Sequence, residues 1–197
     1  MAKPLLKAQA REINTKKSLK ELRKEGFIPA VLYGRNKKTT DVQFNKSETE
    51  KVLNCYGIGS NVEVKIGEKI KPAIIKEIQR HTTKLNVLHI DLQELEADEK
   101  VRVKLPIYLI NRNKIKDTTV VLQQQMEEIE IQTYPKYLPQ SIEIDASKMA
   151  FGEPLLVEHL DIWKNENIEV LSEPEEVIAL LTGVSKIEVT NEEEESI

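Results

Sequence analysis

The sequence is poor in the features that support secretion, membrane insertion and thiol chemistry. Its single cysteine, Cys55, cannot form an internal disulfide and has no CxxC partner, so we interpret it as a packing residue. There is no run of about 18 apolar residues that could span a membrane. The N-terminal segment MAKPLLKAQAREINTKK lacks the apolar core of a secretory signal. These absences predict a cytoplasmic protein with no membrane partner.

The sequence also lacks the motifs of common nucleotide-binding and hydrolytic enzymes. GxxxxGK[ST], GxGxxG, HExxH and GxSxG are all absent. His89 and Asp91 would share one face of a strand, which suits a metal site or a catalytic pair. With His81 they make only three candidate ligands, none of them sulfur, and no nucleophile accompanies them. We therefore expect no enzyme, metal, cofactor or small-molecule substrate, which leaves surface histidines or nucleic-acid contacts as the alternatives.

Charge is divided unevenly along the chain. Residues 1–93 hold 19 Lys and Arg against 10 Asp and Glu, a net charge of +9, and residues 94–197 hold 10 against 23, a net charge of −13. The total of −4 hides this division. A basic half joined to an acidic half predicts two modules with different partners, and the basic one is expected to bind a polyanion.

The basic half, residues 1–93, predicts a small β-barrel with two short helices. Ser18 and Ser47 are expected as N-caps, each followed by a glutamate at the capping-box position, and Gly26 and Gly57 as the stops. Gly67-Glu68 has the signature of a two-residue hairpin loop. The expected strands are AVLYG, TTDVQFN, the two arms of NVEVKIGEKIKPAIIKEIQRH, and NVLHIDLQEL. A closed or partly closed barrel buries them most economically.

The acidic half predicts a second all-β domain, a sandwich or barrel, over residues 94–184. The polar stretch ELEADEK marks the boundary after Gln93. The glutamate-rich residues 185–197 are interpreted as a disordered, solvated tail. Alternation along the expected strands points these apolar residues inward: Val101, Val103, Leu105, Ile129, Ile131, Ile142 and Ile144.

Several features of the basic half favour RNA. Cations are dense in REINTKKSLKELRK and suit phosphates, namely Arg11, Lys16, Lys17, Lys20, Arg23 and Lys24. Backbone N–H groups at a helix start near Ser18 would add to them. Gln79, Arg80, His89 and Asp91 can read base edges, and Tyr33 can stack on a base or bond the backbone. A β platform without a recognition helix suits RNA better than DNA.

A family resemblance accompanies these residues. LRKEGFIPAVLYG, QRH and LHIDL, followed by DEKVRVKLPIYL, LPQSIEIDAS and PEEVIALL, resemble the bacterial large-subunit ribosomal protein family L-twenty-five, in its long, two-domain Ctc form. The resemblance implies a six-stranded N-terminal barrel and a cytoplasmic, ribosomal location. It also implies binding to loop E of 5S rRNA near the central protuberance, beside other rRNA and ribosomal proteins. It assigns the RNA contacts to Arg11, Lys16, Tyr33, Lys76, Gln79, Arg80, His89 and Asp91.

Two points stay open beside this resemblance. His81 is often followed by proline in the family but here by Thr82, which leaves that turn less rigid. The acidic domain is expected to contact protein or solvent, and RNA only through local cations such as Arg112, Lys114 and Lys116. The alternative function is a ribosome-associated general stress protein whose acidic domain recruits a protein partner.

Overall fold

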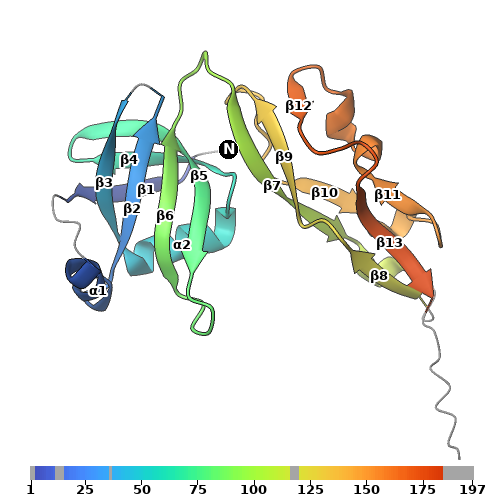
Figure 1. Cartoon of the computed structure of the whole chain (residues 1–197), viewed down its shortest axis with the longest axis horizontal. Helices are drawn as coiled ribbons and strands as arrows, with labels where there is room; N and C mark the ends of the chain where they lie inside the picture. The colour runs from blue at the N-terminus through green and yellow to red at the C-terminus, as the bar shows by residue number, and fades with distance from the viewer. Residues whose placement is uncertain (1–2, 12–15, 36, 116–119, 184–197) are drawn as a thin grey trace, which may run out of the picture.

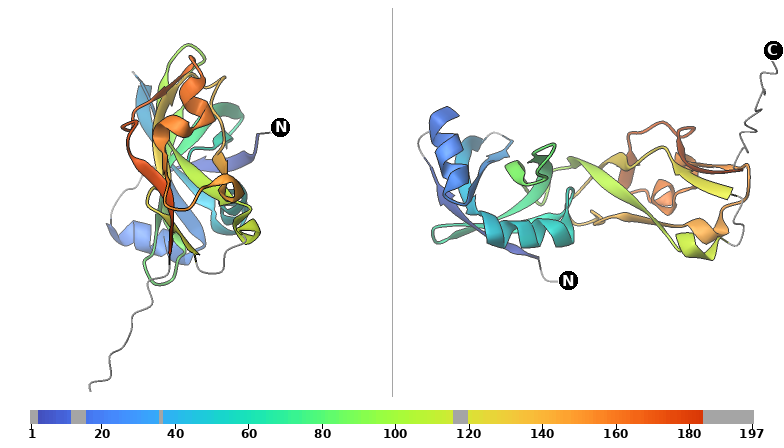
Figure 2. Two further views of the ribbon diagram at one scale, coloured as in Figure 1. Left: turned by 90° about the vertical axis from the view of Figure 1, so that its right-hand side faces the viewer. Right: turned by 90° about the horizontal axis from the view of Figure 1, so that it is seen from below.

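A computed structural model describes residues 3–11, 16–35, 37–115 and 120–183 of the chain. It shows two β-rich units joined end to end (Figure 1), seen from two further directions in Figure 2. The predicted mostly-β fold is confirmed. The predicted tail over residues 185–197 lies outside the described residues. Within those residues no helix is long and apolar enough to cross a membrane.

The first unit is the predicted six-stranded barrel. Its strands close in the order β1-β3-β2-β6-β5-β4, with β1–β4 and β2–β6 parallel and the other pairs antiparallel. Their bounds are β1 (Leu5–Ala10), β2 (Phe27–Gly34), β3 (Lys37–Asn45), β4 (Asn61–Ile66), β5 (Lys69–Arg80) and β6 (Val87–Glu94). Alternate residues such as Ile28, Phe44 and Ile90 are fully buried inside it. Strand β1 was not predicted from the sequence.

Helix α1 (Lys16–Lys24) lies against β2 and connects β1 to it. It begins at Lys16, so the prediction of Ser18 as N-cap is wrong, and Ser18 is the third residue of the helix. The helix ends as predicted, because Gly26 has φ +85°, a left-handed conformation that glycine adopts without a steric penalty.

Helix α2 (Lys46–Tyr56) connects β3 to β4. Its N-cap is Asn45, whose side chain accepts a hydrogen bond from the Glu48 N–H at 3.3 Å, so the prediction of Ser47 is wrong. An asparagine two positions earlier accepts the hydrogen bond from the first turn of the helix that Ser47 was expected to accept. Cys55 is exposed on this helix, whereas Leu53 is buried, so the interpretation of Cys55 as a packing residue is also wrong.

The β4–β5 hairpin matches the prediction. Gly67 and Glu68 form a two-residue loop between the paired residues Ile66 and Lys69, and Gly67 has φ +59°. Strand β5 then runs on to Arg80, and its register against β6 shifts twice, between Ile75 and Glu77 and between Gln79 and Arg80. The first shift leaves Lys76 as an extra residue, as in a β-bulge.

The second unit contains two sheets around one core, as expected of an all-β domain. One sheet has the order β10-β7-β9-β12, and the other β11-β13-β8. Their bounds are β7 (Val101–Ile110), β8 (Val120–Gln124), β9 (Glu128–Thr133), β10 (Ile142–Asp145), β11 (Pro154–Leu156), β12 (Ile168–Val170) and β13 (Val177–Gly183). Short 3₁₀ helices connect them, η1 (Arg112–Lys114), η2 (Ala146–Lys148), η3 (Val157–His159) and η4 (Asp161–Lys164). All the residues predicted to face inward belong to this core or, for Ile144, pack against it half-buried.

The two units are packed together where β5 meets β7. Ile74, in β5, belongs to the core of the second unit, whereas its neighbour Ile75 belongs to the barrel core. A Cβ added at Gly59 would lie 2.9 Å from the Lys104 carbonyl oxygen, so the backbones of the two units approach closely there. Strand β6 ends at Glu94, one residue after the predicted domain boundary, and β7 begins at Val101.

Candidate nucleic-acid interface

Four polar side chains share the outer face of β5 and β6. Gln79 pairs with His89, and Glu77 with Asp91, across the antiparallel ladder. Residues that pair in this way point to the same side of a sheet, while Ile90 between them is fully buried inside the barrel. We call Glu77, Gln79, His89 and Asp91 the β5–β6 face. The predicted placement of His89 and Asp91 on one face is confirmed.

His89 and Asp91 are in direct contact on this face. His89 Nδ1 lies 2.6 Å from Asp91 Oδ1, and both side chains are partly exposed, at 21% and 29%. Asp91 Oδ1 is buried and has no hydrogen-bond partner among the described residues, so this contact is close but is not a hydrogen bond. Asp91 Oδ1 can therefore accept a hydrogen bond from a base amino group or a ribose hydroxyl, and the imidazole nitrogens of His89 can donate or accept one beside it.

Tyr33 on β2 lies next to this face, half-buried. Burial raises the pKa of its hydroxyl, and the charges of Asp91 and Glu77 raise it further. The hydroxyl therefore keeps its proton at neutral pH and can donate to a phosphate or ribose oxygen. These three residues also line a pocket of about 350 Å³ between the two units, with Ile58, Lys76, Lys104, Glu128 and Glu130.

The structure places Lys76 at the junction of the two units. Its ammonium group donates to the Arg102 carbonyl oxygen of β7, and burial lowers its pKa. Lys76 sits at the irregularity of β5, so its side chain departs from the alternation that brings Gln79 to the β5–β6 face. Its predicted role as an RNA contact stays a prediction.

The predicted cations of α1 are brought to the same end of the barrel as the β5–β6 loop (Figure 1). Arg23 Nε donates to the Leu88 carbonyl oxygen at 3.1 Å, which fastens α1 to β6. Lys20 is exposed, and Lys16 and Lys17 are the first two residues of the helix. A basic helix therefore borders the polar face.

The two arginines predicted as contacts differ in their surroundings. Arg11 is only 9% exposed, with Nε donating to the Val42 carbonyl oxygen at 3.2 Å and Nη2 lying 3.5 Å from Asp41 Oδ1. Most of this group is engaged within the barrel. Arg80 is exposed at the end of β5, and its Nη1 makes one long hydrogen bond of 3.4 Å to the Leu85 carbonyl oxygen. Arg80 is thus the better placed to reach a ligand.

His81 has a structural role that the sequence left open. Its Nδ1 accepts hydrogen bonds from the backbone N–H groups of Thr83 and Lys84, at 3.2 and 3.3 Å, in the loop between β5 and β6. Leu85 in that loop has φ +55°. The imidazole thus orders the turn that contains Thr82. A side-chain acceptor at a loop start, as in an Asx turn, was the available sequence signal.

Metal binding finds no support in the described ranges, where no three His, Cys, Asp or Glu side chains are grouped closely enough to hold an ion. The face instead combines donors, acceptors and nearby cations. This set suits the base edges, hydroxyls and phosphates of a nucleic acid.

Comparisons with known proteins agree with this chemistry. Residues 6–92 match the model of the ribosomal L25p family, and residues 100–185 match that of the ribosomal protein TL5 C-terminal domain. The chain is similar to the large ribosomal subunit protein bL25 of Caldicellulosiruptor bescii, with 38% identity over 98% of this chain and 94% of that protein. Proteins of the same name from Finegoldia magna (31% identity, 98% and 90% covered) and Thermodesulfovibrio yellowstonii (36%, 92% and 85%) are also similar.

Proposed function

The chain belongs to the ribosomal L25p family, and on this premise we propose that its barrel binds the loop E region of 5S rRNA. The protein is a structural, non-enzymatic component of the large ribosomal subunit in the bacterial cytoplasm. Its other partners there would be neighbouring rRNA and ribosomal proteins. The relatives described above are named as ribosomal proteins, which gives no support to the alternative of a stress protein acting through its acidic domain.

The observation that carries the proposal is the close His89–Asp91 pair facing Gln79 beside a basic helix, with Asp91 Oδ1 lacking a hydrogen-bond partner among the described residues. Lys and Arg groups of α1 would hold phosphates and position the barrel. The β5–β6 face would then supply the selective hydrogen bonds. RNA offers such a face a shallow minor groove with base edges and 2′-hydroxyls.

Repulsion between two carboxylates on the β5–β6 face supports a role of this face in binding. Glu77 and Asp91 are like charges that pair directly across two strands, an arrangement that destabilises a sheet. Departures of this kind from the rules of folding are expected at functional sites. In a complex, both carboxylates would accept hydrogen bonds from the amino and imino groups of bases, and these bonds would offset the repulsion.

The second unit is proposed to contribute little phosphate binding of its own. Residues 94–197, which contain this unit, have a net charge of −13 that would repel a polyanion. Of its predicted contact cations, Arg112 donates from Nε to the Leu109 carbonyl oxygen at 3.2 Å and from Nη2 to Gln124 Oε1 at 2.9 Å. Lys114 is exposed in η1, and Lys116 lies outside the described residues.

Replacement of Asp91 tests the proposal. Asp91→Ala removes the carboxylate acceptor from the β5–β6 face, so the full chain should bind 5S rRNA about 1–3 kcal/mol more weakly. Binding to an RNA of unrelated sequence should change little. Asp91→Asn, which keeps one acceptor oxygen on the face, should recover part of the loss. Filter-binding titrations with native and loop E-substituted 5S rRNA measure these values.

The matched control is Glu68→Ala, which removes an exposed carboxylate from the β4–β5 loop and should leave 5S rRNA affinity within the experimental scatter. Equal weakening of specific and unrelated RNA by Asp91→Ala would contradict a base-reading role for this face.

A further inference from the structure

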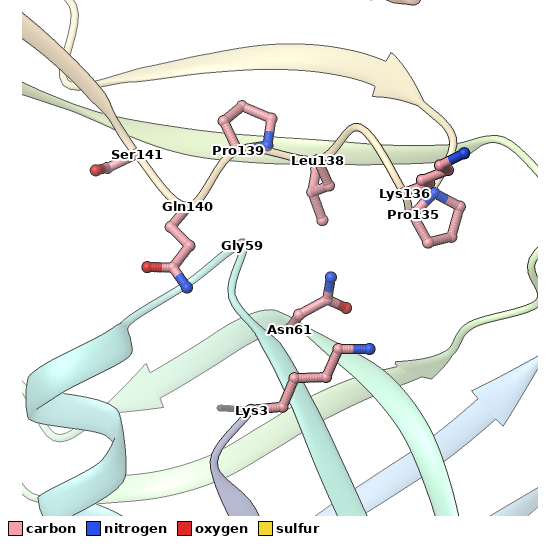
Figure 3. A pocket seen from close by; sticks show the side chains of 9 residues that line it. All are labelled: Lys3, Gly59, Asn61, Pro135, Lys136, Leu138, Pro139, Gln140 and Ser141. Atoms are coloured by element: carbon pink, nitrogen blue, oxygen red, sulfur yellow. The ribbon is translucent and has the colours of Figure 1, made fainter. Parts of the chain in front are cut away.

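A second polar pocket lies between the two units and is separate from the β5–β6 face. Its volume is about 660 Å³, within the range of ligand-binding clefts. The barrel contributes Lys3, Gly59 and Asn61, and the segment after β9 contributes Pro135, Lys136, Leu138, Pro139, Gln140 and Ser141 (Figure 3). The pocket thus exists only where both units meet.

The lining of this pocket is positively charged, whereas the unit that contributes most of its residues is acidic. Lys3 and Lys136 supply two ammonium groups, one from each unit, and none of the nine lining residues is acidic. The second unit as a whole is strongly acidic. A basic pocket against such a background marks the place where this unit can accept an anion.

Asn61 supplies an acceptor that lacks a partner. Its Oδ1 atom is buried and has no hydrogen bond with any described residue, and Figure 3 shows its amide directed between Lys3 and Leu138. A buried polar atom without a partner is costly, and a ligand that donates a hydrogen bond would remove the cost. The ligand should therefore carry both negative charge and hydrogen-bond donors.

Exposed tyrosines flank Lys136 in the segment after β9, beside the residues that line the pocket. Tyr134 and Tyr137 are 37% and 42% exposed. Lys136 Nζ lies 5.7 Å from the centre of the Tyr137 ring, and Lys100 Nζ lies 6.0 Å from that of Tyr134. Alternating cations and tyrosines form the kind of surface on which unpaired bases stack while lysines hold the backbone.

We propose that this pocket binds a single-stranded RNA segment, and that the junction of the two units is a second RNA contact of the protein. Lys3 and Lys136 would hold backbone phosphates, Asn61 Oδ1 would accept from a ribose 2′-hydroxyl, and Tyr137 would stack on a base. Only the choice of RNA as the ligand class rests on the proposed function. The contact is independent of the β5–β6 face.

The probe for this site is an eight-nucleotide oligouridylate titrated into the ¹⁵N-labelled full chain. Signals of Gly59, Gln140 and the Asn61 side-chain amide should shift on binding. Lys3→Gln with Lys136→Gln should weaken binding about tenfold and reduce the salt slope by about 1.4, as for two phosphate contacts on a single strand. The oligodeoxyuridylate of equal length should bind more weakly, because it lacks the 2′-hydroxyl.

The control is Lys38→Gln with Lys69→Gln, which changes the charge equally at exposed lysines that do not line the pocket. Absence of shifts at the pocket, or equal weakening by the control pair, would overturn the proposal. Equal affinity for the ribo- and deoxyribo-oligomers would overturn the role given to Asn61. Asp91→Ala should leave oligouridylate binding intact, so failure of this site and failure of the 5S rRNA proposal are distinguishable.

Discussion

The barrel and the second unit bury their apolar residues by the same alternation but use their outer faces differently. On β7 and β9 the outward charges are opposed in sign: Lys104 pairs with Glu130 across the ladder, and Arg102 Nε lies 3.8 Å from Glu130 Oε1. On β5 and β6 the carboxylates of Glu77 and Asp91 pair across the ladder, and His89 Nδ1 lies 2.6 Å from Asp91 Oδ1 of its own strand. Cross-strand charge pairs stabilise the second unit's sheet. On the barrel's face Gln79 Nε2 donates to Glu77 Oε1 at 3.3 Å, but Asp91 Oδ1 has no hydrogen-bond partner among the described residues and is left for a ligand.

Two adjacent isoleucines offer the strongest test of how separate the units are. Ile74 and Ile75 are both fully buried, but in different cores. Ile74→Ala should destabilise the second unit, and Ile75→Ala the barrel, each by about 3 kcal/mol for a core cavity. Tryptophan fluorescence reports the second unit through Trp163, while amide exchange reports the barrel. Identical effects of both variants on both probes would show one cooperative unit.

Gly59 tests the close contact between the units. Its φ of +83° nearly equals the +85° of Gly26, but an added Cβ at Gly26 meets nothing within 4 Å. Both alanine variants strain the backbone, and only Gly59→Ala also clashes with Lys104 and Leu105. Gly59→Ala should therefore lower the free energy of unfolding by about 2 kcal/mol more than Gly26→Ala. Equal losses of unfolding free energy in urea titrations would mean that the junction accommodates the added methyl group without further destabilisation.

The β5–β6 loop tests whether the barrel's binding end is ordered in advance. His81→Ala removes the acceptor of two backbone N–H groups and should cost about 1 kcal/mol of local stability. His81→Asn keeps a side-chain acceptor and should preserve the loop. Amide exchange at Thr83 and Lys84 measures the effect. Unchanged exchange in the alanine variant would show that the loop does not depend on the imidazole.

The smallest expected effect concerns the ion pairs beside the linker. Burial alone would raise the pKa of Glu94, but hydrogen bonds from Lys37 and Lys71, both 2.8 Å, bring it below its ordinary value of 4.5. A pKa that is lower in the folded state than in the unfolded state stabilises the protein at pH values above the unfolded-state pKa. This contribution is lost as the pH falls through the folded-state pKa.

Glu94→Gln should therefore cost about 0.5 kcal/mol near pH 7 and progressively less below pH 4.5. Chemical unfolding across this range, with the exposed Glu68→Gln as the control, measures the difference. A pH-independent loss would point to packing in place of charge.

The sequence was informative at positions where the backbone conformation strongly favours one residue type. Gly26, Gly57 and Gly67 marked the helix ends and the hairpin correctly because each adopts positive φ. The helix starts were wrong because several residues can cap a helix, and Asn45 did so in place of Ser47. Cys55 was misplaced because it lies on the exposed face of α2, whereas Leu53 lies on the buried face.

The candidate site was partly predictable for the same kind of reason. Alternation alone placed His89 and Asp91 together, and the structure adds their 2.6 Å contact. Alternation could not place Lys76, because an irregularity of β5 turns that residue towards Arg102. Nor could it reveal the pocket between the units, since Lys3 and Lys136 are far apart in sequence and meet only through the tertiary packing.

Strand β1 has a consequence for the order in which the chain can assemble during synthesis. It pairs with β3 on one side and with β4, more than fifty residues later, on the other. The first strand made must therefore wait until residues 61–66 have emerged before the ring can close, and such non-local pairing is slow. Loss of the first ten residues would leave β3 and β4 as open edges, which invite association with other chains.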